Sequence, residues 1–118
     1  MAVSRSTVIG FLLAEVLVFL LAVLAHGGVV IKGYEHSNAA TAEAVIAAVL
    51  TGGLIIAATR PFLVKRAALF SQGFALLGVC VGVVMIFIGV GPQTRPDMVL
   101  HAVMLALLIG GLVAASRL

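Results

Sequence analysis

Hydrophobic residues run along this chain in four long blocks separated by short polar stretches. The blocks cover about residues 7–25, 39–59, 67–90 and 98–115. A helix needs ~20 apolar residues to cross the ~30 Å hydrocarbon core of a bilayer, and each block is close to that length. The pattern predicts four membrane-spanning helices in a single membrane domain that covers residues 1–118, which is an all-α four-helix bundle.

Composition agrees with this pattern and narrows the function classes. Hydrophobic residues make up 64% of the chain and charged residues 9%, a balance too apolar for one soluble core of 118 residues. The lipid bilayer is therefore the first expected partner, and no nucleic-acid partner is expected. We find no nucleophile–base pair, metal-ligand spacing or phosphate-binding loop, so we expect no enzymatic activity, no cofactor and no metal site.

The basic residues of the short connections predict the orientation. Arg5, the three basic residues within 60–66 and Arg117 would lie on one side of the membrane, against Lys32 and Arg95 on the other. Because cytoplasmic loops carry the excess of Lys and Arg, both termini are predicted to be cytoplasmic, in a bacterial inner membrane. The first block could also be read as a secretory signal, but its length and Glu15 favour a retained helix.

Polar residues next to the blocks predict where the helices begin and end. Ser37 and Asn38 are expected to cap the second helix, and residues 94–97 read as a capping box that opens the fourth. Asp97 is accordingly interpreted as a cap and not as a ligand. Gly91 and Pro92 are expected to end the third helix.

Glu15 lies in the middle of the first apolar block. An ionisable side chain at that depth is costly, so it usually marks a transport pathway or a partner. The alternative is that Glu15 only holds helices together, for instance through a hydrogen bond to Gln72.

An internal repeat relates the two halves of the chain. With a shift of 58 residues, seven of the eleven positions in 44–54 match those in 102–112. This suggests a duplicated two-helix hairpin with a pseudo-twofold axis along the membrane normal. A shift of 57 or 58 residues also pairs Glu15 with Gln72 and Glu43 with His101.

The paired polar residues predict a route for protons or small cations. His26 follows Glu15 by eleven residues, which places the two on one helix face ~16 Å apart. We expect Glu15 to carry the proton, Gln72 to be its hydrogen-bond partner, and Glu43, His101 and His26 to form an outer relay. Simpler readings stay open, because Glu43 near a helix start and solvated interfacial histidines need no function. A haem held by His26 and His101 is also conceivable.

Small residues predict how the helices pack. Gly78 and Gly82 form a GxxxG step, and Gly53 and Gly110 begin small-xxx-small steps in two other helices. Such surfaces allow close helix contacts within a bundle or between chains. Because four helices enclose little interior, we expect a homo-oligomer or a larger assembly with other membrane subunits.

Two short stretches resemble known families. Residues 13–16, Leu-Ala-Glu-Val, resemble the glutamate step of small multidrug resistance transporters. That resemblance implies that Glu15 binds protons and cationic substrate in turn within a homodimer. Residues 50–76, which include Gln72, are similar to the start of hydrogenase-4 component E, and more distantly to small subunits of cation/proton antiporters and complex I. That resemblance implies that Gln72 belongs to a chain of proton-translocating groups.

These observations predict a small multi-pass inner-membrane protein that takes part in proton or cation translocation as a subunit of an assembly. A small homodimeric proton-coupled transporter is the first alternative. A structural accessory subunit without chemistry is the second.

Overall fold

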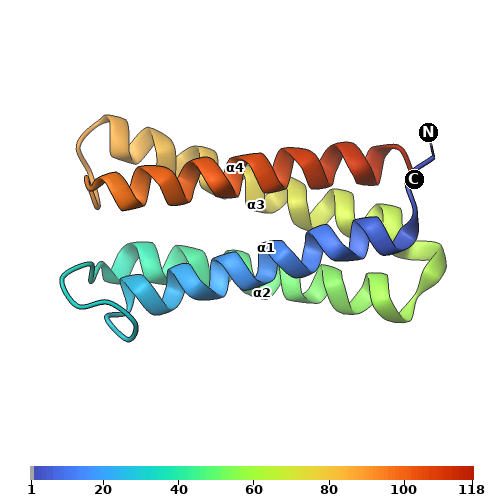
Figure 1. Ribbon diagram of the computed structural model, residues 1–118, viewed down its shortest axis with the longest axis horizontal. Helices are drawn as coiled ribbons and strands as arrows, with labels where there is room; N and C mark the ends of the chain where they lie inside the picture. The colour runs from blue at the N-terminus through green and yellow to red at the C-terminus, as the bar shows by residue number, and fades with distance from the viewer. Residues whose placement is uncertain (1) are drawn as a thin grey trace.

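The computed structural model describes residues 2–118, which form a bundle of four antiparallel helices. The elements are α1 (Arg5–His26), α2 (Ser37–Thr59), the short 3₁₀ helix η1 (Pro61–Leu63), α3 (Val64–Phe87) and α4 (Arg95–Ser116). Figure 1 shows the helices side by side along one long axis, with both ends of the chain at the same end of the bundle. All four helices are long and apolar enough to cross a membrane. The predicted all-α four-helix fold is confirmed.

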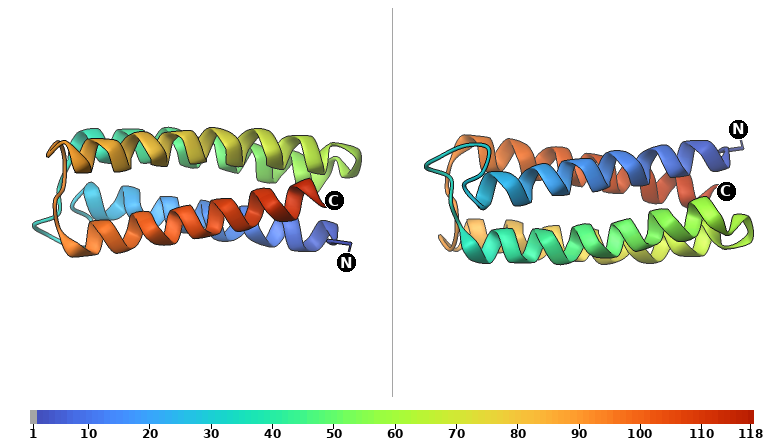
Figure 2. Two further views of the ribbon diagram at one scale, coloured as in Figure 1. Left: turned by 90° about the horizontal axis from the view of Figure 1, so that it is seen from above. Right: turned by 90° about the horizontal axis from the view of Figure 1, so that it is seen from below.

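Each helix packs against its two neighbours around the bundle, so that α1 and α3 contact both α2 and α4. Figure 2 shows the two hairpins, α1–α2 and α3–α4, from two further sides. Across the diagonal, α1 and α3 also touch each other. The longest dimension of the Cα trace is 43 Å, which matches the ~40–45 Å of a bilayer with its headgroups.

Two helix ends differ from the sequence-based expectation. The N-cap of α2 is His36, whose Nδ1 accepts a hydrogen bond from the Ala39 N–H, so neither Ser37 nor Asn38 is the cap. An imidazole with an unprotonated nitrogen accepts such a bond as well as a hydroxyl does. α3 ends at Phe87, before the predicted Val90, where the chain turns through Gly89 at a φ of +80°. Thr94 caps α4 as expected.

In each hairpin, one basic side chain of the first helix donates hydrogen bonds to carbonyl groups at the C-terminus of the second helix. Arg5, at the start of α1, donates to the carbonyls of Ala57 and Ala58 at the end of α2, at 3.0 and 2.6 Å. Lys65, at the start of α3, donates to the Ser116 carbonyl at the end of α4, at 2.9 Å. A cation at a helix C-terminus meets unpaired carbonyls and the negative end of the helix dipole. Each hairpin therefore uses a basic side chain from its first helix to bind the C-terminal carbonyls of its second helix.

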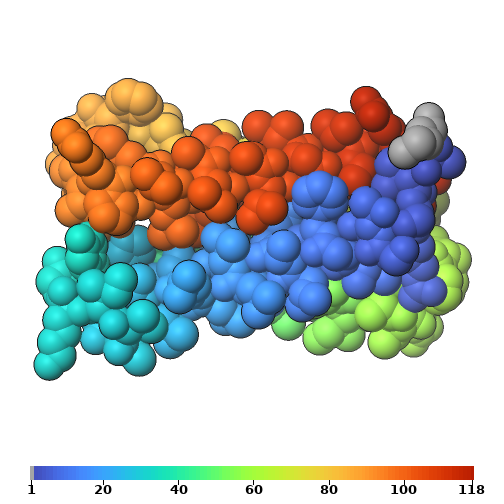
Figure 3. All heavy atoms as spheres, in the orientation of Figure 1, coloured from blue at the N-terminus to red at the C-terminus, as the bar shows by residue number. Residues whose placement is uncertain are grey.

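The bundle keeps a small-residue and aliphatic core and turns large apolar side chains outward, as lipid-facing helices do. Figure 3 shows α1 and α4 packed closely along one face. The four glycines predicted to pack helices each face a neighbouring helix: Gly53 lies against Ser71, Gly78 against Ile46, Gly82 against His101 and Gly110 against Phe11.

Candidate functional site

Two polar clusters lie inside the bundle at different depths. The deeper one joins α1 to α3 across the diagonal. Gln72 Nε2 donates hydrogen bonds to Oε1 and Oε2 of Glu15, at 3.0 and 3.1 Å, and both side chains are fully buried. The structure thus brings together the two residues that the repeat pairs. We call them the inner pair.

The inner pair leaves one acceptor unused. Gln72 Oε1 is buried and has no hydrogen-bond partner among the described residues. An amide places an acceptor and a donor on the same carbon, so a half-turn of the group exchanges their positions. The amide can therefore donate to an ionised Glu15 or accept from a protonated one.

Gly111 of α4 makes room for the inner pair. A methyl group at this position would collide with the Gln72 amide and the Glu15 carboxylate. Sequence reasoning noted Gly111 only as a repeat match. Its role follows from the position of α4 beside the α1–α3 diagonal, which sequence spacing does not reveal.

The second cluster lies at the opposite end of the bundle from the termini and joins three helices. His26, at the end of α1, contacts a carboxylate through each ring nitrogen. Its Nδ1 lies 2.8 and 2.9 Å from the two carboxylate oxygens of Glu43, and its Nε2 lies 2.9 Å from Asp97 Oδ1. All three residues are buried. We call them the outer triad.

The outer triad carries charge in a confined space. Each of its two nitrogen–carboxylate contacts needs one proton between the partners. Two protons shared by one imidazole and two carboxylates leave one net negative charge, wherever the protons lie. Thr94 also donates its hydroxyl hydrogen to Asp97 Oδ2. The described residues include no lysine or arginine bonded to this cluster.

Asp97 is the residue that the sequence analysis assigned too narrowly. It does sit in the predicted capping box, with its backbone N–H on the Thr94 hydroxyl. Its carboxylate also reaches across to α1, where it holds His26. The capping pattern explained Asp97 completely on its own, so no local signal pointed to the distant histidine.

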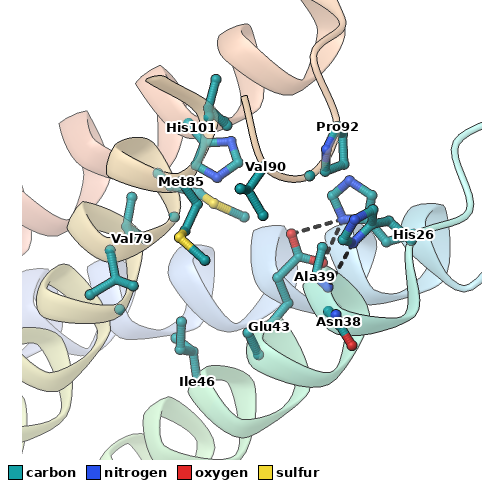
Figure 4. Close-up of a pocket in the computed structure, with 18 of the residues that line it drawn as sticks. His26, Asn38, Ala39, Glu43, Ile46, Val79, Met85, Val90, Pro92 and His101 are labelled. Carbon is teal, nitrogen blue, oxygen red and sulfur yellow. Dashed lines mark hydrogen bonds and ion pairs between the residues drawn. The ribbon is translucent and has the colours of Figure 1, made fainter. Parts of the chain in front are cut away.

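A cavity of about 270 Å³ opens beside the outer triad, between α2 and α3 and under the α3–α4 loop. Figure 4 shows His26, Glu43 and His101 around it, with Met85, Ile46 and Val79 among the apolar lining. His101 Nδ1 lies 2.7 Å from the backbone oxygen of Asp97 and must donate to it, so in the neutral imidazole Nε2 is an acceptor. The described contacts include no hydrogen bond between His101 and Glu43, the second pair of the repeat.

Buried apolar side chains separate the inner pair from the outer triad. Phe19 and Ala22 fill the intervening turns of α1, Ala75 and Val79 those of α3, and Met104 and Leu108 those of α4. The predicted residues are therefore grouped at two depths of the bundle, with Glu15 in the inner group and His26 in the outer one. No buried polar side chain of these three helices lies in the turns between them.

The contacts of His26 also limit whether this site could hold a haem. Both ring nitrogens of His26 are engaged by carboxylates, so a haem held by His26 and His101 would require the outer triad to break. No group of three His, Cys, Asp or Glu side chains in residues 2–118 is placed to hold a metal ion.

Comparison with protein-family models, with curated proteins and with solved structures found no match. The candidate site is therefore interpreted from its own geometry.

Proposed function

We propose that this small multi-pass membrane protein takes part in moving protons, or small cations in their place, as one subunit of a larger membrane assembly. In this proposal it lies in a bacterial inner membrane with both termini in the cytoplasm, and it has no enzymatic chemistry of its own. Glu15 carries the proposal, because it is fully buried in the middle of a membrane-length helix with an amide as its partner. Burying a carboxyl at this depth costs more free energy than burying an apolar residue, so its presence points to a functional role.

The inner pair suits a group that gains and loses a proton. When Glu15 is ionised, the Gln72 N–H donors stabilise it; when Glu15 is protonated, Gln72 Oε1 can accept its hydrogen. The helices need not move between these arrangements, since only the amide turns. The outer triad then exchanges protons with the side of the membrane opposite the two termini. It does so through His26, since histidine is the residue type that titrates near neutral pH.

The apolar turns between the two clusters act as a gate in this account. A proton crosses them only when water enters the layer around Phe19 and Met104 or when these side chains move aside. The resemblance of residues 50–76 to hydrogenase-4 component E and to antiporter subunits supports the proposal, since a polar residue at the place of Gln72 belongs to the proton path in those families.

The test compares two substitutions of the same kind. The tagged protein is isolated in mild detergent with the membrane subunits that stay bound, reconstituted in liposomes, and assayed for proton flux with an internal pH dye. Glu15→Gln is expected to lower flux at least about tenfold. Glu35→Gln, at an exposed glutamate in the α1–α2 loop, is the control and should conduct as the wild type does. Equal flux from both variants would refute the proposal.

A structural accessory subunit is the second candidate, and the apolar turns between the clusters favour it. In that case the inner pair serves only to join α1 to α3. Glu15→Leu with Gln72→Leu would then keep both assembly and flux, whereas the proton-carrying role requires flux to be lost.

A further inference from the structure

The cavity beside the outer triad contains three soft or borderline donor atoms that form no hydrogen bond among the described contacts. They are the free Nε2 of His101 and the thioether sulfurs of Met85 and Met104, all from residues that line the cavity. Met104 is 1% exposed and Met85 41%, so the set lies between the bundle interior and its surface. Figure 4 shows His101 and Met85 at the same cavity, with sulfur atoms in yellow.

Local structure brings these donors to one place. Met104 follows His101 by three residues on α4, which puts both on one helix face. The His101 ring packs on Gly82 of α3, where an added Cβ would lie 3.2 Å from Nε2. Met85 follows Gly82 by three residues on α3. One methionine from α3 and one from α4 therefore line the same cavity as His101.

A backbone contact selects the tautomer of His101 that can bind a metal through Nε2. Its Nδ1–H donates to the Asp97 carbonyl oxygen at 2.7 Å, so in the neutral imidazole Nε2 carries the lone pair. A backbone carbonyl on the second nitrogen is the usual support of a metal-ligating histidine, because it sets the tautomer and the ring orientation.

We propose that this cavity binds a soft monovalent metal ion, Cu(I), through His101 Nε2, Met85 Sδ and Met104 Sδ. Thioether ligands select Cu(I) over hard cations, and imidazole completes a set of three. The largely apolar lining suits an ion of low charge. The outer triad, with Glu43 and His26 at the same cavity, supplies one net negative charge that balances a single positive one. The site does not depend on the proposed proton route.

Silver(I) is the probe, because it prefers the same ligands and does not change oxidation state under the assay. The full chain in detergent micelles carries Cys80→Ser throughout, since the exposed Cys80 thiol would bind silver by itself. Calorimetric titration is expected to give one silver ion per chain. Met104→Leu and Met85→Leu are each expected to weaken binding by about tenfold or more, while circular dichroism confirms that the helices remain.

Met98→Leu is the matched control, because Met98 precedes His101 by three residues on α4, is 51% exposed and does not line the cavity. It should bind silver as the Cys80→Ser parent does. His101→Gln should also lose affinity at least about tenfold, since it removes the nitrogen ligand. The proposal is overturned if the parent binds no silver, if either cavity methionine can be replaced without effect, or if Zn²⁺ binds more tightly than silver.

Discussion

Gln72 of α3 donates both of its amide contacts to the carboxylate of Glu15 on α1, across the diagonal of the bundle. Diagonal helices are the pair that packs least in a four-helix bundle, so this contact joins elements that side-chain packing alone holds weakly. The contact is also wholly buried, and the proposed proton-carrying role rests on it.

The inner pair should behave as a coupled unit in stability measurements. Gln72→Leu leaves the Glu15 carboxyl without its donor and is expected to lower the free energy of unfolding by about 1–3 kcal/mol. Glu15→Leu combined with Gln72→Leu should recover part of that loss, giving a coupling of about 0.5–2 kcal/mol in a double-mutant cycle. Unfolding in mixed micelles measures each term. Gln93→Leu, in the exposed α3–α4 loop, is the control, and additive effects would contradict a direct contact.

Gly111→Ala should destabilise the protein more than any other glycine-to-alanine change on α4's inward face. The methyl group would displace the Gln72 amide and the Glu15 carboxylate. We expect a cost of about 1–3 kcal/mol, which is typical of overpacking. Gly73→Ala is the matched control, because nothing lies within 4 Å of its added Cβ and alanine favours a helix. Equal free energies of unfolding for the two variants would contradict the close approach of α4 to the inner pair.

His26→Leu should loosen the outer end of three helices together. It removes the proton-bearing group between Glu43 and Asp97 and leaves two carboxylates facing each other. Breaking a buried ion pair costs about 3–5 kcal/mol. Hydrogen exchange should rise at the end of α1 and at the starts of α2 and α4.

Removing the two charges as well should restore part of the protection. His26→Leu with Glu43→Gln and Asp97→Asn leaves neutral side chains of similar size in place of the carboxylates. If the triple variant exchanged as fast as His26→Leu alone, the two carboxylate charges would not be the reason that His26 is needed.

The orientation can be tested with single cysteines in the Cys80→Ser background. Lys32→Cys and Arg66→Cys lie at opposite ends of the bundle, both on exposed residues. A membrane-impermeant thiol reagent added to whole cells is expected to label Lys32→Cys and to leave Arg66→Cys unlabelled until the membrane is opened. The opposite labelling would place the termini outside the cytoplasm.

The helices and the inner pair could be predicted from sequence because both correspond to patterns that are visible along the chain. Twenty-residue apolar blocks fix the number of helices, and Glu15 and Gln72 stand out as polar residues inside them. The repeat then pairs the two across an axis, and the structure has them in contact.

The outer triad could not be predicted in full, because its geometry depends on how far α1 and α4 approach at one end. His26 was predicted to belong to an outer relay with Glu43 and His101, but Asp97 already had a sufficient explanation as a cap. The predicted cap of α2 was wrong for a related reason. Serine and asparagine are the more usual caps, and only the loop geometry brings His36 Nδ1 to the Ala39 N–H.

In the proposed function, Glu15 gains and loses a proton inside the bundle while the Gln72 amide turns to match it. Infrared difference spectroscopy of the full chain in lipid nanodiscs, as pH is stepped, measures this directly. We expect a protonated-carboxyl band that disappears as pH rises, together with a change in a glutamine amide band. Both should be absent in Glu15→Gln and unchanged in Glu35→Gln. A Glu15 carboxyl that keeps one protonation state at every pH at which the protein stays folded would contradict its role as a proton carrier.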